Sequence, residues 1–300
     1  MIETAEGDLS VWRRAVGAVM AATMLGASLA ACTAQPPPSP PPPASDGGGE
    51  AEVALTDLFG TTALIGLWRV SDAEGETADT WLRLASDDAT LWRPCGFIMG
   101  SWSAVAGELV AGFFAAHEDC VTGKEMPKVD WLADAVTYER DGDGWVLRDT
   151  DGGVVARLGI DGAPPPHRHS SPENVEPPEV TSDADARVAA VALPAGLTPA
   201  DETDLLGRWV PTPAASNDPY LEVTSDGGWS GSDGCNGGEG RWSVPHPGVL
   251  VATEGPMTLA WCEGSGVPTS FGQARAVGFD GDELVLIDHR GDEIGRLVRD

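Results

Sequence analysis

The sequence predicts a mainly β fold, built as two tandem antiparallel β domains that each contain a curved sheet and one short helix. Short stretches with alternating apolar residues are separated by Gly and Asp clusters every eight to twelve residues, which is typical of antiparallel strands. Asp-Gly pairs at 141–142 and 280–281 separate two such stretches and indicate hairpin turns. Helix is expected only near 129–135 and 270–276, and no alternation of strands with helices suggests a parallel sheet.

The composition restricts the possible partners. The 300 residues include 47 acidic and 18 basic side chains, giving a formal net charge of -29. Sequence-independent binding to nucleic acid needs Lys and Arg to displace counterions, so nucleic acid is excluded as a main partner. The same charge disfavours docking onto anionic lipid, while 42% hydrophobic residues are enough for folded cores.

Residues 1–31 have the layout of a lipoprotein signal peptide. Arg13 and Arg14 precede an apolar stretch that ends in Leu29-Ala-Ala-Cys32, and this end resembles a lipobox. Small residues suit a narrow peptidase cleft, and the Cys32 thiol would take the lipid. We therefore expect a lipid-anchored protein on the extracytoplasmic face of the cell membrane. The alternative is an uncleaved transmembrane anchor, for which about 20 apolar residues are needed.

The sequence leaves two starts open, at Met1 and at Val11. Residues 1–10 carry three acidic side chains, which are unusual before the apolar stretch of a signal peptide, and a start at Val11 gives a conventional one. A chain begun at residue 11 that failed to reach the membrane would rule the shorter start out.

Two Pro-rich segments suggest the domain boundaries. Residues 32–52 combine a proline run with glycines, which indicates an extended tether rather than a ligand for an SH3-type domain. Residues 161–200 are Pro-rich and polar, and they are expected to link two domains at 53–160 and 201–300.

The two predicted domains share anchors in the same order, which indicates an internal duplication. The matches are Leu64–Trp68 with Leu205–Trp209, Thr80–Leu84 with Pro219–Val223, Cys95, Gly100 and Trp102 with Cys235, Gly240 and Trp242, Cys120 with Cys262, and Tyr138–Leu147 with Gly278–Leu286. The matched tryptophans are expected in cores. Trp229 and Trp261 have no counterparts, and either could line a surface groove.

Four cysteines remain when Cys32 is set aside for lipid. Their spacing predicts one disulfide in each copy, Cys95 with Cys120 and Cys235 with Cys262, because an exported chain oxidises. Each bond is expected to stabilise the fold by about 3 kcal/mol. The alternative, a catalytic thiol, lacks an evident His partner in the second copy.

The second copy resembles the META domain of HslJ-like bacterial envelope proteins. The resemblance rests on Ser230–Trp242, with its Gly-Cys-Asn loop, on Leu205–Trp209 before it and on Thr258–Cys262 after it, and it covers about residues 204–299. It departs at Ala260-Trp261, where the family usually has Met-Ala. The first copy, at about 63–158, is degenerate. The resemblance implies a small β-rich domain without known catalytic residues, often lipid-anchored and linked to stress response or to surface roles.

Several motifs suggest chemistry but have simpler explanations. Asp141-Gly-Asp143 and Asp280-Gly-Asp282 could bind calcium, yet both occupy the same hairpin turn, which turn chemistry explains. Ser230 lacks the Gly two residues later that a nucleophile elbow needs. His167-Arg-His169 is at most half of a metal site. We therefore expect no catalysis, no metal and no cofactor.

The best candidate for a ligand loop is Asp233, Asn236, Glu239 and Trp261, since glycines there expose polar groups. A tight disulfide-held turn would explain the same residues. The sequence favours a non-catalytic binding or interaction module at the outer face of the membrane, with an unknown envelope protein or glycan as its partner. The alternative is a passive structural or stress-protective envelope component without a specific ligand.

Overall fold

The computed structural model describes residues 60–86, 88–121, 126–166, 172–258, 260 and 265–300. The chain divides into two units, residues 1–46 and 47–300, and every described residue belongs to the second. The predicted signal peptide, Cys32 and the tether therefore lie outside the described residues. None of the helices in the described part is long and apolar enough to cross a membrane.

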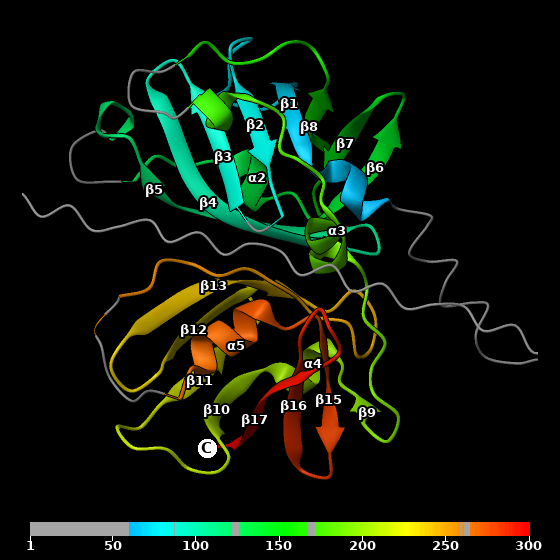
Figure 1. Ribbon diagram of the computed structural model, residues 1–300, viewed down its shortest axis with the longest axis vertical. Coiled ribbons are helices and arrows are strands. Elements are labelled where there is room, and N and C mark those ends of the chain that lie inside the picture. Colours follow the sequence, from blue (N-terminus) through cyan, green and yellow to red (C-terminus); the bar gives the residue numbers. More distant parts are fainter. Residues whose placement is uncertain (1–59, 87, 122–125, 167–171, 259, 261–264) are drawn as a thin grey trace, which may run out of the picture. The chain divides into compact units, whose positions relative to one another are not determined.

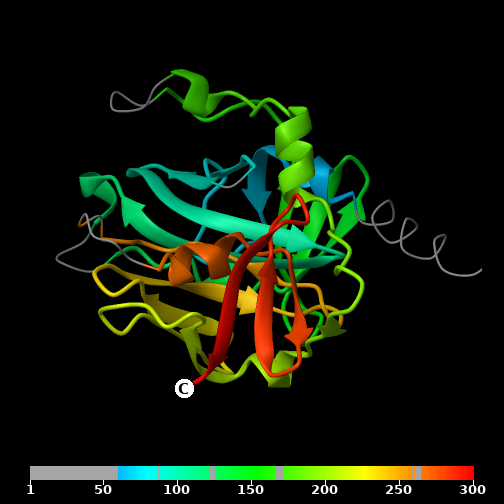
Figure 2. The same cartoon turned by 60° about the horizontal axis from the view of Figure 1, so that its bottom comes forward.

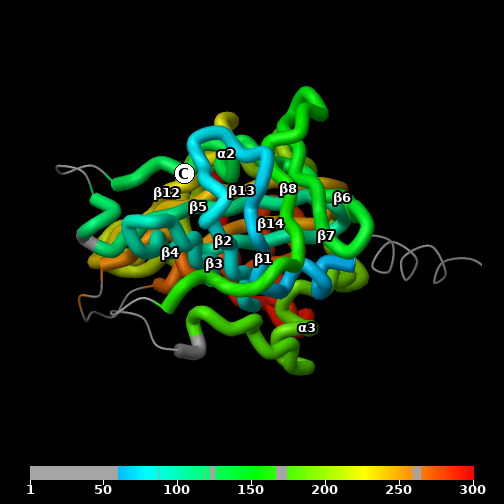
Figure 3. Tube along the Cα trace, turned by 90° about the horizontal axis from the view of Figure 1, so that it is seen from above, coloured from blue at the N-terminus to red at the C-terminus, as the bar shows by residue number. Residues whose placement is uncertain are grey.

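The first half of the described chain forms a closed antiparallel barrel in which eight strands follow one another in sequence order (Figure 1). Its elements are η1 (Thr61–Leu64), β1 (Gly66–Ser71), β2 (Trp81–Leu84), β3 (Asp88–Arg93), β4 (Gly96–Val105), β5 (Glu108–Ala116), η2 (Glu118–Cys120), α2 (Asp130–Ala133), β6 (Thr137–Asp141), β7 (Gly144–Arg148) and β8 (Val154–Gly159). β8 pairs back onto β1, with Val70 opposite Leu158, and this pairing closes the barrel. Figure 3 shows β8 next to β1 from above.

Alternation along the strands separates two apolar faces. Trp68, Leu82 and Leu91 belong to the main core of the barrel, whereas their neighbours Leu67 and Trp81 form a second cluster with Trp92. Successive strand residues point to opposite faces, so the second cluster lies on the outside of the sheet. The barrel therefore leaves an apolar patch that another segment has to cover.

The second half forms a nine-stranded antiparallel sheet in the order β14-β13-β12-β11-β10-β17-β16-β15-β9. Its elements are β9 (Thr198–Pro199), α4 (Glu202–Leu205), β10 (Gly207–Pro211), β11 (Tyr220–Val223), β12 (Gly228–Ser232), β13 (Gly237–Ser243), β14 (Val251–Ala252), α5 (Val267–Gln273), β15 (Ala276–Asp280), β16 (Glu283–Ile287) and β17 (Glu293–Arg299). A bridge between Val249 and Ala276 brings its two ends together. Phe271 of α5 is fully buried in its core.

The predicted mainly β fold is confirmed, and the expected short helices appear as α2 and α5. Both predicted Asp-Gly hairpins form, with Gly142 and Gly281 in the left-handed region at φ 61° and 63°. Matched tryptophans make matched hydrogen bonds. Trp68 Nε1 donates to the carbonyl of Leu64, and Trp209 Nε1 donates to the carbonyl of Leu205, each at 2.8 Å.

The described part of the predicted linker is not free of structure. It contains η3 (Pro172–Val175), α3 (Ser182–Val188) and β9. Val175 packs on the outer cluster of Trp81 and Trp92, and Ala184 and Val188 of α3 join the barrel core. These few apolar residues of the linker pack on the barrel because they bury surface that the barrel leaves uncovered.

Residues 47–300 form one compact unit, and the barrel and the second sheet touch within it. Val105 and Val110 of the barrel cluster with Val251 of β14. The hydroxyl of Ser243 donates to Oε2 of Glu108 at 3.0 Å, so a polar contact joins the same surfaces. Burial raises the pKa of Glu108, an effect that the Ser243 hydrogen bond and His246 oppose and that Glu202 reinforces.

Candidate functional site

The predicted ligand loop uses its polar groups within the chain. Asp233 Oδ1 accepts the backbone N–H groups of Cys235 at 2.7 Å and Asn236 at 2.6 Å. Asn236, whose side chain is buried, donates from Nδ2 to Asp233 Oδ2 at 3.0 Å and to the carbonyl of Ala260 at 2.9 Å. Its Oδ1 accepts the N–H of Ala260 at 2.6 Å. Asn236 therefore ties the loop to the segment around residue 260.

Three of the four predicted loop residues are described by the structure, and it brings two of them, Asp233 and Asn236, together. Glu239 is exposed on β13 and has no hydrogen bond to Asp233 or Asn236 among the described contacts. Trp261 and the predicted disulfide partner Cys262 lie outside the described residues. Cys235 is disulfide-bonded and exposed.

Trp229 does not line a surface groove, so that expectation is corrected. It is 4% exposed and stacks edge-to-face on Phe271, with ring centroids 5.5 Å apart. Its Nε1 donates to the carbonyl of Thr253 at 3.1 Å. Alternation in β12 points this side chain inward, so it adds to the core.

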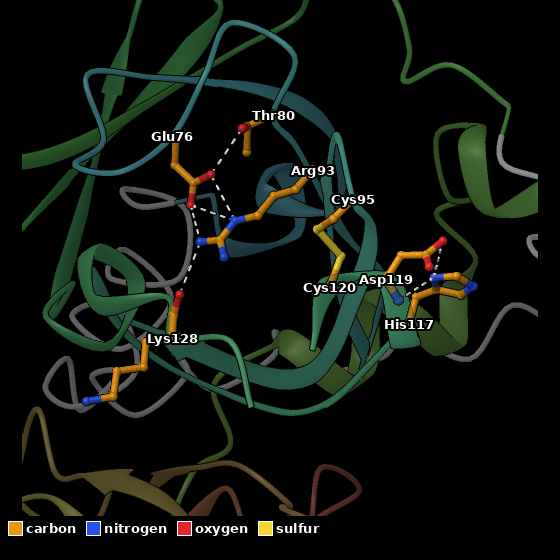
Figure 4. The surroundings of a disulfide bond; sticks show 8 residues. All are labelled: Glu76, Thr80, Arg93, Cys95, His117, Asp119, Cys120 and Lys128. Atoms are coloured by element: carbon orange, nitrogen blue, oxygen red, sulfur yellow. Dashed lines mark hydrogen bonds and ion pairs between the residues drawn. A yellow bond between two sulfur atoms is a disulfide. The ribbon is translucent and has the colours of Figure 1, made fainter. Parts of the chain in front are cut away.

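The predicted bond between Cys95 and Cys120 is present, and it joins the start of β4 to η2 (Figure 4). A disulfide holds no thiolate, so nucleophilic catalysis by these sulfurs does not apply while the bond is intact. Nearby, His117 Nδ1 accepts the backbone N–H of Asp119 at 3.3 Å. The disulfide therefore has a structural role, since it fixes η2 against β4.

A buried ion pair beside the disulfide was not predicted from the sequence (Figure 4). The Glu76 side chain is 3% exposed and lies against the guanidinium of Arg93. Trp131 Nε1 donates to its Oε1 at 2.7 Å, and Thr80 donates to its Oε2 at 3.1 Å. Burial raises the pKa of this carboxyl, but the Arg93, Trp131 and Thr80 contacts outweigh it and leave the pKa lowered. Every partner is internal, which indicates a structural role.

The acidic hairpin turns form ion pairs with arginine. Asp141 pairs with Arg157, and Asp280 pairs with Arg296 at 2.9 Å, at matching positions of the two halves. Ser230 lies exposed within strand β12, so it has no strand-to-helix setting. Within the described residues no three His, Cys, Asp or Glu side chains gather as metal ligands would. His167 and His169 lie outside those residues.

A cavity of about 530 Å³ lies between the barrel and the second sheet. Its wall includes three arginines and a histidine from separate segments, although the whole chain is strongly acidic: Arg187 of α3, Arg275 after α5, and His289 and Arg290 of the β16–β17 turn. Figure 2 shows this turn, in red, beside α3. Arg187 and Arg290 lie more than 100 positions apart in the sequence, so no local motif predicts the site.

Arg275 is held in place by backbone carbonyls, and Arg187 pairs with Asp183 at 2.9 Å. Arg275 Nε donates to the carbonyl of Arg187 at 3.1 Å, and its Nη1 donates to that of Ala274 at 3.0 Å. Burial lowers the pKa of His289, and the charges of Arg187, Arg290 and Arg275 lower it further against the opposing effect of Asp288. The field of the three arginines therefore reaches this imidazole.

Three carboxylates also line the cavity. Asp288 Oδ1 accepts the N–H groups of Arg290 at 2.8 Å and Asp292 at 2.9 Å, so it shapes the turn. Asp88 faces Arg83 at 3.4 Å. Glu254 differs, since its buried Oε1 accepts no hydrogen bond within the described part of the chain. The site thus combines positive groups with one acceptor that lacks a donor.

A second cavity of about 190 Å³ lies beside α5 and β17. It is lined by Thr212, Ser265 and Ile294 among others, and its cation Arg296 is already paired with Glu293, Asp280 and Glu283. The larger cavity is therefore the better candidate.

Compared with known proteins, the chain matches no family model, no curated protein and no solved structure. The candidate site therefore has to be judged on its own geometry.

Proposed function

We propose that this chain is a lipid-anchored binding module of the cell envelope, which holds a small ligand in the cavity between its two sheets. The signal-like residues 1–31 and the lipobox cysteine Cys32 support an extracytoplasmic position, and the proline-rich stretch that follows supports a tether. The partner is an envelope glycan or protein that presents this ligand, and no catalytic step is included in the proposal.

The observation that carries the proposal is the cavity itself. Its volume of about 530 Å³ lies in the range of small-molecule sites, roughly 300–1,000 Å³. Its lining gathers arginines from three segments and carboxylates from Asp88, Glu254 and Asp288 at one place. A ligand-binding role accounts for this cavity, whereas a passive structural role does not.

The META-like assignment of the second copy belongs to the same proposal. The matching element order of the two halves and their matching Trp–carbonyl hydrogen bonds support a duplication. In this proposal the Gly-Cys-Asn loop stabilises the second copy, because the side-chain amide of Asn236 forms hydrogen bonds with Asp233 and Ala260.

Site-specific photo-crosslinking on intact cells tests the proposal. A benzophenone side chain replaces Phe114, which lines the cavity and is 36% exposed, and in a control protein it replaces Val154, which is 40% exposed and does not line it. We expect a discrete adduct at position 114 that is absent at 154, found by mass spectrometry. The adduct is expected to require the anchored protein, so Cys32→Ala should abolish it.

The opposite outcomes are equally clear. Equal adducts at 114 and 154 would indicate unspecific contact, and no adduct at either would favour a passive envelope component. Retention of Cys32→Ala in the membrane fraction at the wild-type level would remove the lipid anchor from the proposal.

A further inference from the structure

Asn236 is followed by Gly237, and this is the single Asn-Gly pair in the sequence. The other asparagines, Asn174 and Asn217, are followed by Val and by Asp. In an Asn-Gly pair the backbone nitrogen of the glycine can attack the side-chain amide carbon, because no Cβ hinders the approach and glycine reaches the required backbone conformation at little cost. The sequence therefore contains one position at which deamidation is intrinsically fast.

The reaction has two steps, and water is its only co-reactant. The nitrogen of Gly237 bonds to Cγ of Asn236 while the bond from Cγ to Nδ2 breaks. Nδ2 leaves as ammonia and takes the proton that the Gly237 nitrogen loses. Water then opens the resulting succinimide ring at one of its two carbonyl groups, which leaves aspartate or isoaspartate at position 236.

The folded loop opposes the first of these steps. Asn236 is only 6% exposed, and its amide is bonded at both ends. Nδ2 donates to Asp233 and to the carbonyl of Ala260, and Oδ1 accepts the N–H of Ala260. The attack requires Cγ to swing towards the nitrogen of Gly237, and this rotation breaks all three bonds. Gly237 is itself held in β13, where it lies opposite Ser232 of β12.

Asp233 is the residue on which this protection depends most. Its Oδ1 accepts the N–H groups of Cys235 and Asn236, and its Oδ2 accepts Nδ2 of Asn236, so one carboxylate holds both the loop backbone and the reactive amide. Burial raises the pKa of Asp233, but the hydrogen bonds from Asn236 and Cys235 outweigh it and leave the pKa lowered. The carboxylate is therefore charged at neutral pH, where it is the stronger acceptor.

The product of the reaction cannot restore these contacts. Aspartate at position 236 has no amide donor, and its carboxylate would replace an amide that lies 3.0 Å from Asp233 Oδ2, so two like charges would repel each other. Isoaspartate also adds a methylene group to the main chain at the start of β13, next to the pairing of Gly237 with Ser232. The reaction therefore destabilises the loop in which it occurs.

We propose that Asn236-Gly237 is a deamidation site that the folded loop protects. Deamidation proceeds through molecules in which the loop has opened, and it converts a reversible local opening into a permanent loss of stability in the second half. The site is separate from the cavity, so this inference stands or falls independently of the proposed binding function.

Peptide mapping by mass spectrometry tests the proposal on the oxidised, detergent-solubilised full chain at neutral pH. Loss of ammonia and gain of water raise the mass of the peptide that contains residue 236, and the rate is followed with and without urea. We expect deamidation at Asn236 to be at least about tenfold slower in the folded protein than in urea, because only the opened fraction reacts. Asn217 serves as an internal reference in the same digests.

Two variants separate the fold from the local chemistry. Asp233→Ala should accelerate deamidation of the folded protein at least about tenfold, since it removes a charged acceptor from the amide, and should leave the rate in urea unchanged. Gly237→Ala should slow the reaction in urea, and the fold tolerates it because a Cβ at this position lies 3.8 Å from the carbonyl oxygen of Gly231. Glu239→Ala, on the same strand and without a bond to Asn236, is the matched control and should not change either rate.

Equal rates for Asn236 with and without urea would overturn the proposed protection. An unchanged rate in a folded Asp233→Ala protein, whose folding is checked by thermal melting, would show that the loop contacts do not control the reaction. Faster reaction of Asn217 than of Asn236 in urea would remove position 236 as the intrinsically fast site.

Discussion

Replacing Asn236 by Ala should destabilise the protein without touching the cavity. The substitution removes two hydrogen bonds to Ala260 and one to the Asp233 carboxylate. A neutral hydrogen bond contributes about 0.5–1.5 kcal/mol and one to a charged group about 1.5–3 kcal/mol. Ala260 is exposed, so water can replace part of the loss. We therefore expect a decrease of about 2–3 kcal/mol in the free energy of unfolding.

This prediction can be measured by urea denaturation and by thermal melting of the oxidised protein. For a unit of this size each kcal/mol lowers Tm by about 2–4 °C, so Asn236→Ala should lower it by roughly 4–12 °C. Glu239→Ala is the matched control, because Glu239 is exposed on the adjoining strand and should change stability by less than about 0.5 kcal/mol.

The substitution Asn236→Asp sharpens the test. It places a second carboxyl group where the Asn amide now lies 3.0 Å from Asp233 Oδ2, so repulsion at neutral pH should add to the loss. Part of the stability should return when the pH is lowered. A change below about 0.5 kcal/mol for Asn236→Ala would refute the reasoning, since it would mean that other contacts alone fix the loop.

Three further substitutions have defined outcomes. Glu76→Gln should cost about 2 kcal/mol at pH 7, because it leaves the partly buried Arg93 without its charged partner, although Arg93 keeps its bond to the Lys128 carbonyl. The pKa of Glu76 is lowered on folding, so wild type should lose this advantage as the pH falls below the unfolded pKa. Denaturation across pH 3–7 checks both effects. Glu108→Gln should stabilise the protein at pH 7, and its side-chain oxygen still accepts the Ser243 hydrogen bond. The pKa of Glu108 is raised on folding, so the wild-type protein should lose stability as the pH rises through that pKa. The variant should not show this loss. Gly100→Ala should lower Tm clearly in a melting experiment, since a Cβ there would lie 2.0 Å from a β5 carbonyl oxygen.

Much of the fold follows from local signals in the sequence. Asp-Gly pairs mark both hairpins because Gly142 and Gly281 adopt a left-handed conformation that other residues avoid. Gly100, noted only as a repeated anchor, sits where β4 shifts its register against β5, and its lack of a side chain permits the close approach. These features depend on neighbouring residues, so a sequence reports them directly.

Other features depend on packing between distant segments. The absence of a counterpart suggested a surface role for Trp229, but its place in β12 and its contact with Phe271 put it in the core. Linker residues such as Val175 and Val188 have no periodic pattern, and their burial depends on apolar surface elsewhere in the barrel. The proline content of the linker carries no information about the apolar surface of the barrel that these residues cover.

The proposed duplication helps to predict the fold of the two halves and does not help to predict the cavity. Matched positions carry the contacts that each half uses to fold, so Asp149 and Asp288 shape the same turn in both halves. A site between the two halves needs residues that differ, because the two halves present different surfaces to it. His289 and Arg290 are such residues. The β16–β17 turn keeps the backbone hydrogen bonds of its counterpart in the first half but differs from it in charge. A comparison of the two halves therefore finds this turn, whereas a search for repeated motifs does not.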